Sequence, residues 1–129
     1  MKNLISESEI LSSIIKYLYL KGIFVTRMHT QGVWDQNRKI LRKNQSMKGV
    51  SDLIGLLPNG KFLAIEVKTE KGIVSSDQKA YLDSINKNNG IGIIARSLKD
   101  VEDFILKYEK DELESYLSTL KPPKIHIDF

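Results

Sequence analysis

Three charged residues lie in two apolar stretches of the sequence, where a folding chain normally places aliphatic side chains. Asp52 opens the stretch DLIGLL, and Glu66 and Lys68 close the stretch FLAIEVK. Two carboxylates that meet could hold a divalent cation, because Mg²⁺ is commonly bound by one or two carboxylates together with water and phosphate. The alternative is that Asp52 is a turn residue and that Glu66 and Lys68 form an ion pair on an exposed strand face.

The two stretches are predicted to form an antiparallel hairpin, because the turn sequence PNG at residues 58–60 joins them. In a two-residue turn centred on the last two of these residues, Asp52 lies near Val67, and Glu66 and Lys68 are its neighbours. The three charges then gather at one end of the hairpin. Two carboxylates together need a cation or a proton, since a buried charge without a partner is costly. Lys68 supplies one cation, and a metal ion could supply a second.

The remaining sequence alternates between helical and extended patterns, without an internal repeat. Ser6 with Glu9, and Ser75 with Gln78, have the spacing of a capping box at the start of a helix. The polar stretch over residues 29–48 is predicted to be a loop, and loops of this length are usually functional or mobile. The predicted α/β order is α-β-β-β-α-β-α: a helix over 6–22, strands over 23–28, 52–57 and 62–67, a helix over 75–88, a strand over 91–95, and a helical segment from 97 to the prolines at 122 and 123.

Length and composition bound the class of protein. With 129 residues, of which 41% are apolar, the chain is expected to form one globular domain over residues 1–129. It contains no cysteine, which excludes disulfides, thiolate catalysis and zinc–thiolate sites. It shows neither a signal peptide nor an apolar run near the roughly 20 residues of a membrane span, so a soluble cytoplasmic protein without a membrane partner is expected.

Charge is unevenly distributed along the chain, whose formal net charge is +4. From residue 99 to residue 114, seven acidic residues face three lysines. The stretch from 27 to 49 is the reverse, with Asp35 as its only acidic residue, and such a basic segment suits a polyanion such as a nucleic acid. A solvated loop kept polar for solubility is the alternative. The candidate nucleic-acid contacts are Arg27, Arg38, Lys39, Arg42, Lys43 and Lys48.

Three ordered motifs resemble the signature of VRR-NUC domains, which belong to the PD-(D/E)XK superfamily of Mg²⁺-dependent nucleases. They are GVSDLIG over residues 49–55, IEVK over 65–68 and SSDQ over 75–78. Ser51 stands where the family usually has proline, a departure that affects backbone stiffness and not a metal ligand. The resemblance covers about residues 6–97 and implies a restriction-endonuclease-like core with a four-stranded mixed sheet flanked by helices. Residues 98–129 are then a C-terminal helical extension.

The resemblance also implies roles for individual residues. Asp52 and Glu66 are expected to bind Mg²⁺, for which Mn²⁺ substitutes, with the main-chain carbonyl of Val67 as a further ligand. Lys68 is expected to position or activate the attacking water. The same roles suit the chemistry, because cleaving a phosphodiester requires neutralising charge on the phosphoryl oxygens and lowering the pKa of water. Gln78 is expected to hold the active site or the scissile strand, and a helix cap is its alternative role.

Many family members also place a glutamate of the first helix at the metal, and the sequence offers Glu7 and Glu9. At about 100° per residue, Glu7 lies about 10° from the centre of the helix's apolar face, whereas Glu9 lies about 170° from it. Glu7 is therefore the predicted ligand, and Glu9 is the predicted cap that returns to Ser6. A solvated carboxylate in the first turn is the alternative for Glu7. Arg27 is either a phosphate contact or part of a peripheral salt bridge.

Together these features predict a metal-dependent endodeoxyribonuclease that is selective for DNA structure, with branched DNA of the Holliday type as the leading substrate. Flap cleavage, duplex cleavage and nicking are the alternatives within the family. A homodimer is expected, because cutting two strands of a junction symmetrically requires two active sites related by a two-fold axis. Two other classes stay open: a DNA-binding module without catalysis, and a protein-interaction domain that works through its acidic C-terminal segment.

Overall fold

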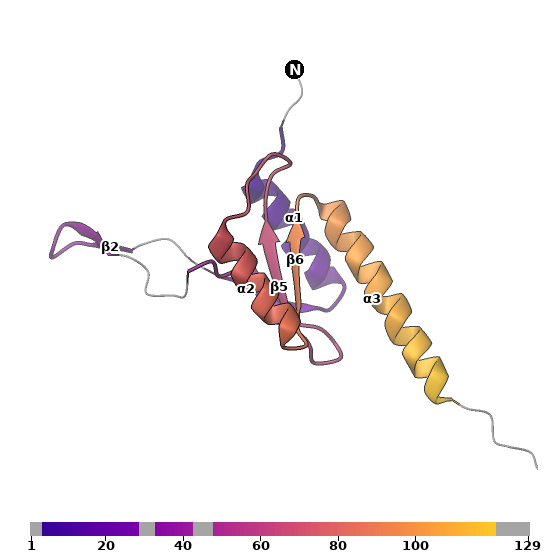
Figure 1. Cartoon of the computed structure of the whole chain (residues 1–129). Coiled ribbons are helices and arrows are strands. Elements are labelled where there is room, and N and C mark those ends of the chain that lie inside the picture. Colours follow the sequence, from indigo (N-terminus) through magenta and orange to yellow (C-terminus); the bar gives the residue numbers. More distant parts are fainter. Residues whose placement is uncertain (1–3, 29–32, 43–47, 121–129) are drawn as a thin grey trace, which may run out of the picture. The chain divides into compact units, whose positions relative to one another are not determined.

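The computed structural model describes residues 4–28, 33–42 and 48–120, and for residues 33, 34 and 40–42 it describes the backbone only. The chain forms two compact units, residues 1–98 and residues 99–129. In chain order, the helices and strands shown in Figure 1 are α1 (Glu7–Leu20), β1 (Phe24–Arg27), β2 (Val33–Asp35), β3 (Ile40–Arg42), β4 (Leu53–Leu56), β5 (Phe62–Val67), α2 (Ser76–Lys87), β6 (Ile91–Ala95) and α3 (Leu98–Thr119).

A four-stranded mixed sheet in the order β1-β4-β5-β6 forms the centre of the first unit. The pairs β1–β4 and β4–β5 are antiparallel, and β5 and β6 are parallel. Helix α1 contacts β1 and β5, whereas α2 contacts β5 and β6, and Figure 1 shows these two helices on opposite sides of the sheet. Strand β5 is therefore covered on both faces, and its residues Leu63–Val67 are all buried.

Helix α1 forms because its apolar residues recur at helical spacing and because both of its ends have a local stop. At the start, the Ser6 hydroxyl accepts a hydrogen bond from the N–H of Glu9 at 3.2 Å. At the end, Gly22 has a φ of 72°, in the left-handed region that ends helices. Burying an aliphatic side chain contributes roughly 1.5–3 kcal/mol. The buried residues of α1 are Ile10, Leu11, Ile14 and Leu18.

The predicted α/β fold with a mixed four-stranded sheet is confirmed, and several elements have the predicted bounds. The strand predicted over 62–67 is β5, and the strand predicted over 91–95 is β6. The segment predicted to be helical from residue 97 contains one continuous helix, α3, of 22 residues. The prolines at 122 and 123 lie outside the described residues. Among the described helices, none is long and apolar enough to cross a membrane.

The stretch over 29–48 contains a short β-hairpin, where only a loop was predicted. Strands β2 and β3 pair with each other in antiparallel orientation. Asp35 organises the turn between them, because its Oδ1 accepts the N–H groups of Asn37 at 3.0 Å and Arg38 at 3.2 Å. Aspartate commonly nucleates turns through such side-chain bonds. The prediction was wrong because strands of three residues are too short to show a two-residue period.

The hairpin of β4 and β5 differs from the prediction by one residue in its register. The backbone N–H of Leu57 donates to the carbonyl oxygen of Lys61 at 2.9 Å. The loop between them, residues 58–60, therefore has three residues and not the predicted two. Leu53 pairs with Ile65, and the same register continued by one residue puts Asp52 opposite Glu66. Because a slip of one residue exchanges the two faces of a strand, this register places both carboxylates on the same face.

Gly49 allows the chain before β4 to lie directly against the start of α2. Its φ is 81°, in the left-handed region that favours glycine. A Cβ at this position would overlap the carbonyl group of Asp77 and would lie 2.7 Å from the backbone nitrogen of Gln78. The glycine of the first motif therefore sets how closely α2 approaches the segment that leads into Asp52.

Replacing Gly49 by alanine is predicted to destabilise the protein much more than replacing Gly60. Gly60→Ala is the matched control, because Gly60 has a similar φ of 87° but a Cβ there would meet nothing within 4 Å. The control should lose about 1–2 kcal/mol of unfolding free energy, which is the cost of a left-handed L-residue. Gly49→Ala should lose more, because the overlap with α2 is added. Urea denaturation measures both losses, and equal losses would contradict the steric contact.

Candidate metal centre

The backbone holds Asp52 from both sides at the end of β5. The carbonyl oxygen of Asp52 accepts the N–H of Met28, which follows β1, at 2.8 Å. Its carboxylate oxygen Oδ2 accepts the N–H of Val67 at 2.8 Å. Residues directly opposite each other in an antiparallel pair have Cβ atoms about 4.5–5.5 Å apart. Asp52 and Glu66 therefore share one end of the sheet.

The two carboxylate oxygens of Glu66 have different surroundings. The side chain is buried, with 3% of it exposed. Its Oε1 accepts a hydrogen bond from Nε2 of Gln78 at 2.9 Å and lies 3.8 Å from Nζ of Lys68. Its Oε2 is buried and has no hydrogen-bond partner among the described residues. A buried carboxylate oxygen without a partner costs free energy, so a cation at Oε2 would be stabilising.

The electrostatic environment of Glu66 favours its protonated form. Its pKa is raised from 4.5 to about 8, first by burial and next by the nearby charge of Asp52. The charge of Lys68 lowers this pKa, whereas the charge of Glu7 raises it, by less than the burial and Asp52 do. Near neutral pH the Glu66 carboxyl therefore keeps a proton unless another cation offsets the charge of Asp52.

The carboxylate pair fits a hard divalent cation whose coordination is completed by water and substrate. Mg²⁺ in proteins is usually held by one or two carboxylates and keeps several waters. Asp52 and Glu66 supply two carboxylates, and Oε2 of Glu66 is the buried atom that lacks a partner among the described residues. Within residues 4–28, 33–42 and 48–120, no three acidic or histidine side chains lie close enough to share an ion. The fit therefore rests on this pair.

Gln78 caps α2 and holds Glu66 at the same time. Its backbone N–H donates to the Ser75 hydroxyl at 3.1 Å, and its Oε1 accepts the N–H of Ser75 at 2.9 Å. These two bonds form the predicted capping box. Its Nε2 donates to Oε1 of Glu66 at 2.9 Å. The cap and the contact with the carboxylate were predicted as alternatives, and they coexist because an amide has both an acceptor and donors.

The two glutamates at the start of α1 lie in different surroundings. Both are exposed. The charge of Glu7 raises the pKa of Glu66. Glu9 lines a cavity beside the start of α1, and its N–H donates to the Ser6 hydroxyl, which is one half of the predicted capping box. Of the two candidates, Glu7 is therefore the one with an electrostatic connection to the carboxylate pair.

The basic residues predicted to contact nucleic acid are exposed wherever their side chains are described. Arg27 ends β1 and pairs with Leu53, which is the neighbour of Asp52, so it lies close to the carboxylates in the register of the sheet. For Arg42 only the backbone is described, and Lys43 lies outside the described residues. The exposed residues are Arg27, Arg38, Lys39 and Lys48.

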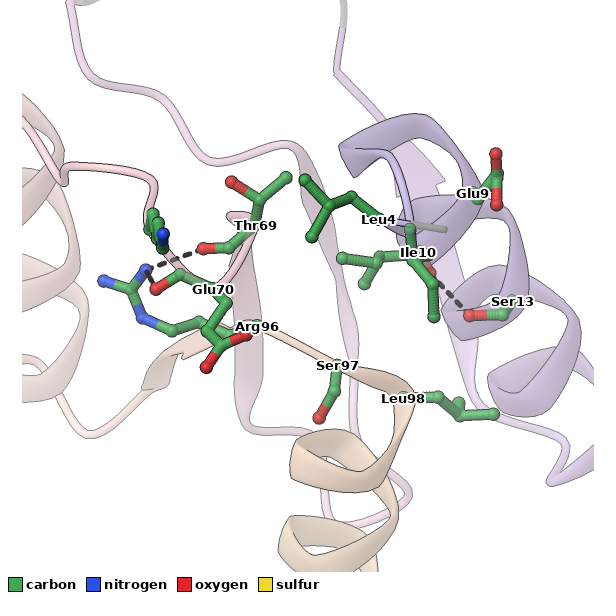
Figure 2. A pocket seen from close by; sticks show the side chains of 11 residues that line it. Leu4, Glu9, Ile10, Ser13, Thr69, Glu70, Arg96, Ser97 and Leu98 are labelled. Carbon is green, nitrogen blue, oxygen red and sulfur yellow. Dashed lines mark hydrogen bonds between the residues drawn. The ribbon is translucent and has the colours of Figure 1, made fainter. Parts of the chain in front are cut away.

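The contacts of two residues, Ser51 and Arg96, were not indicated by any sequence pattern. Ser51 is fully buried, and its hydroxyl donates to the carbonyl oxygen of Leu53 at 2.9 Å. Arg96 follows β6 and lines a cavity of about 890 Å³, together with Thr69 and Glu70 from the segment after β5 (Figure 2). Arg96 and Thr69 are 27 positions apart, so no local spacing rule could have paired them.

Comparison with known proteins identifies a similar family. The sequence model of the VRR-NUC domain family matches residues 26–98, a range that includes Asp52, Glu66, Lys68 and Gln78. A solved structure described as a VRR_NUC domain protein has a similar fold, with a TM-score of 0.60 at 16% sequence identity. The similarity covers 84% of this chain and 91% of that chain. Among curated proteins, no sequence matches this one.

The raised pKa of Glu66 predicts how stability depends on pH in the absence of divalent cations. The folded protein keeps this proton up to about pH 8, whereas the unfolded chain releases it above about pH 4.5. The free energy of unfolding should therefore fall as the pH rises through this window. Thermal unfolding in a metal chelator measures the slope.

Glu66→Gln is the control for this pH dependence, because an amide does not titrate, and it should flatten the slope. Addition of Mg²⁺ should stabilise the wild-type protein most at the upper end of the window, where the ion no longer competes with the proton. A slope that is the same in the wild type and in Glu66→Gln would show that other groups cause it.

Proposed function

The chain belongs to the VRR-NUC family of nuclease domains, and from this premise we propose that it is a Mg²⁺-dependent endodeoxyribonuclease that cuts branched DNA. One observation carries the proposal: Oε2 of Glu66 is buried beside Asp52 and has no hydrogen-bond partner among the described residues. A divalent cation suits this position, because it offsets both carboxylate charges at once. Mn²⁺ is expected to substitute for Mg²⁺.

In this proposal each residue around the carboxylate pair has one task. Asp52 and Glu66 hold the cation, with the carbonyl oxygen of Val67 as a further ligand. The bound ion supplies charge neutralisation at the phosphoryl group and a more acidic water. Gln78 restrains Glu66 through Oε1. Lys68, whose side chain is 15% exposed and 3.8 Å from the same oxygen, directs its ammonium to the attacking water.

The basic residues between positions 27 and 48 support DNA as the substrate. Basic side chains that meet phosphates release counterions, so binding should weaken as salt is raised and should depend little on base sequence. Arg27 is the proposed contact nearest the scissile phosphate, because its two N–H groups can bind a phosphate together. The other proposed contacts are Arg38, Lys39, Arg42, Lys43 and Lys48.

The proposal of branched DNA goes together with that of a homodimer. Two strands of a junction are cut symmetrically when two copies of the site are related by a two-fold axis. Helix α3 and the residue directly after it carry apolar side chains that are more than half exposed and that recur every seven residues, a pattern typical of a helix that pairs with another helix. These residues are Leu106, Leu113 and Leu120, with Leu117 beside them.

Asp52→Asn is predicted to abolish cleavage while leaving DNA binding intact, because the change removes one charge and little volume. Cleavage of a four-way junction in Mg²⁺ should fall by at least roughly 100-fold, the scale of losing one preorganised electrostatic group. Asp83→Asn is the matched control, since Asp83 is an exposed residue of α2, and it should cut like the wild type. Labelled junction, flap and duplex substrates, each with and without Mg²⁺, provide the assay.

The outcomes of this assay separate the candidate activities. Faster cutting of the flap or the duplex than of the junction would assign the protein to that substrate. Equal cleavage by the wild type and Asp52→Asn would exclude the catalytic assignment. DNA binding by the wild type without cleavage in either Mg²⁺ or Mn²⁺ would favour a binding module without catalysis.

The roles of Glu7 and Glu9 are predicted to differ in a paired substitution. Glu7→Gln should raise the Mg²⁺ concentration needed for half-maximal cleavage, because it removes a negative charge that acts on Glu66. Glu9→Gln should leave this concentration unchanged and is the matched control from the same helical turn. Titration of cleavage with Mg²⁺ measures both, and a larger effect of Glu9→Gln would reverse the assignment.

A further inference from the structure

Arg96 fastens the connection between β5 and α2. Its Nη1 donates hydrogen bonds to the carbonyl oxygens of Thr69 at 2.8 Å, Glu70 at 3.1 Å and Gly72 at 2.8 Å. Figure 2 shows the guanidinium beside Thr69 and Glu70. Three carbonyl dipoles that point at one place repel one another unless a cation joins them, and a charged, planar donor is well suited to this. One side chain therefore holds the path of this turn.

The turn held by Arg96 lies against the stem of Lys68. The N–H of Gly72 donates to the carbonyl oxygen of Thr69 at 3.0 Å, which closes the turn. A Cβ at Gly72 would lie 3.3 Å from Cβ of Lys68, so the turn folds back onto that residue. The backbone N–H of Lys68 donates to the carbonyl oxygen of Ala95 at 3.0 Å. The end of β6 thus holds Lys68 directly through Ala95 and indirectly through Arg96.

The residue that opens this connection and the first turn of the helix that follows it both lie near the same atom of Glu66. At its start, Nζ of Lys68 lies 3.8 Å from Oε1. At its end, Ser75 caps α2 and orients Gln78, whose Nε2 donates to Oε1 at 2.9 Å. A displacement of the turn would therefore change both contacts at once, although Arg96 is distant from Glu66 in the sequence.

We propose that Arg96 is a positioning residue of the active site, which holds the β5–α2 connection so that Lys68 and Gln78 both meet Oε1 of Glu66. Oε2 is thereby left for the cation. This inference rests on the proposed nuclease function. It has a kinetic consequence, because a misplacement of about 1 Å at a reacting group can lower the rate about 100-fold.

Arg96→Met, Arg96→Lys and the control Lys71→Met test this role. Lys71 is exposed on the same turn, so its substitution removes a charge without removing the bonds to the carbonyl groups. Arg96→Met is expected to lower kcat by about 10–100-fold, the usual effect of losing a residue that orients the groups around a metal. The KM for DNA should change little. Arg96→Lys should restore part of kcat, since an ammonium has three donors. Lys71→Met should cut like the wild type.

A double substitution separates positioning from a general loss of stability. In the Lys68→Met background, adding Arg96→Met should lower kcat much less than it does in the wild type, because one of the contacts that Arg96 positions is already gone. A protein that is merely destabilised would lose the same factor in both backgrounds. Equal factors, a change confined to KM, or wild-type kcat in Arg96→Met would each overturn the inference.

A measurement without DNA distinguishes failure of this inference from failure of the proposed function. The side-chain amide signals of Gln78 in a ¹H–¹⁵N NMR spectrum, assigned with Gln78→Glu, report its contact with Glu66. Arg96→Met should shift these signals, Arg96→Lys should shift them less, and Lys71→Met should not shift them. If the wild type cuts no DNA and the signals still shift, the function is rejected and the positioning role stands. Unchanged signals in Arg96→Met would reject the positioning role whatever the activity.

Discussion

The repulsion between two carboxylates in a buried position is the constraint on which this site depends. Glu66 is almost fully buried beside Asp52, and burial together with that charge raises its pKa to about 8. A proton, an ammonium or a metal ion can offset such a pair. Lys68 lowers the pKa of Glu66, but the pKa stays far above its usual value, so the ammonium alone does not offset the repulsion. The pair therefore suits a divalent cation.

The fold creates this arrangement by placing Glu66 at the end of a strand that is covered by helices on both faces. The same burial that stabilises β5 removes water from Glu66, so stability and the raised pKa have one cause. The supports come from separate elements: Asp52 from the segment before β4, Gln78 from the cap of α2, and Arg96 from the end of β6. Gly49 lets α2 approach closely enough for Gln78 to take part.

Most of the fold and most residues of the candidate site could be predicted, whereas the contacts between them could not. Capping boxes, helical periods and apolar runs indicated the helices and four strands, because these signals lie within a few neighbouring residues. The register of the β4–β5 hairpin was wrong by one residue, since PNG allows loops of two or three residues. Strands β2 and β3 were missed, because three-residue strands leave no periodic pattern.

The sequence by itself determined which residue types are present, the order of the main elements and the family, because motifs and periodicity are local properties of a chain. It also placed Asp52, Glu66 and Lys68 near the same end of one hairpin. Only the tertiary structure decided that Oε1 of Glu66 is held while Oε2 has no partner among the described residues. It alone brought Arg96 to the turn after β5. Such contacts join residues that are far apart in the chain, and they arise from packing and strand register, which no local pattern specifies.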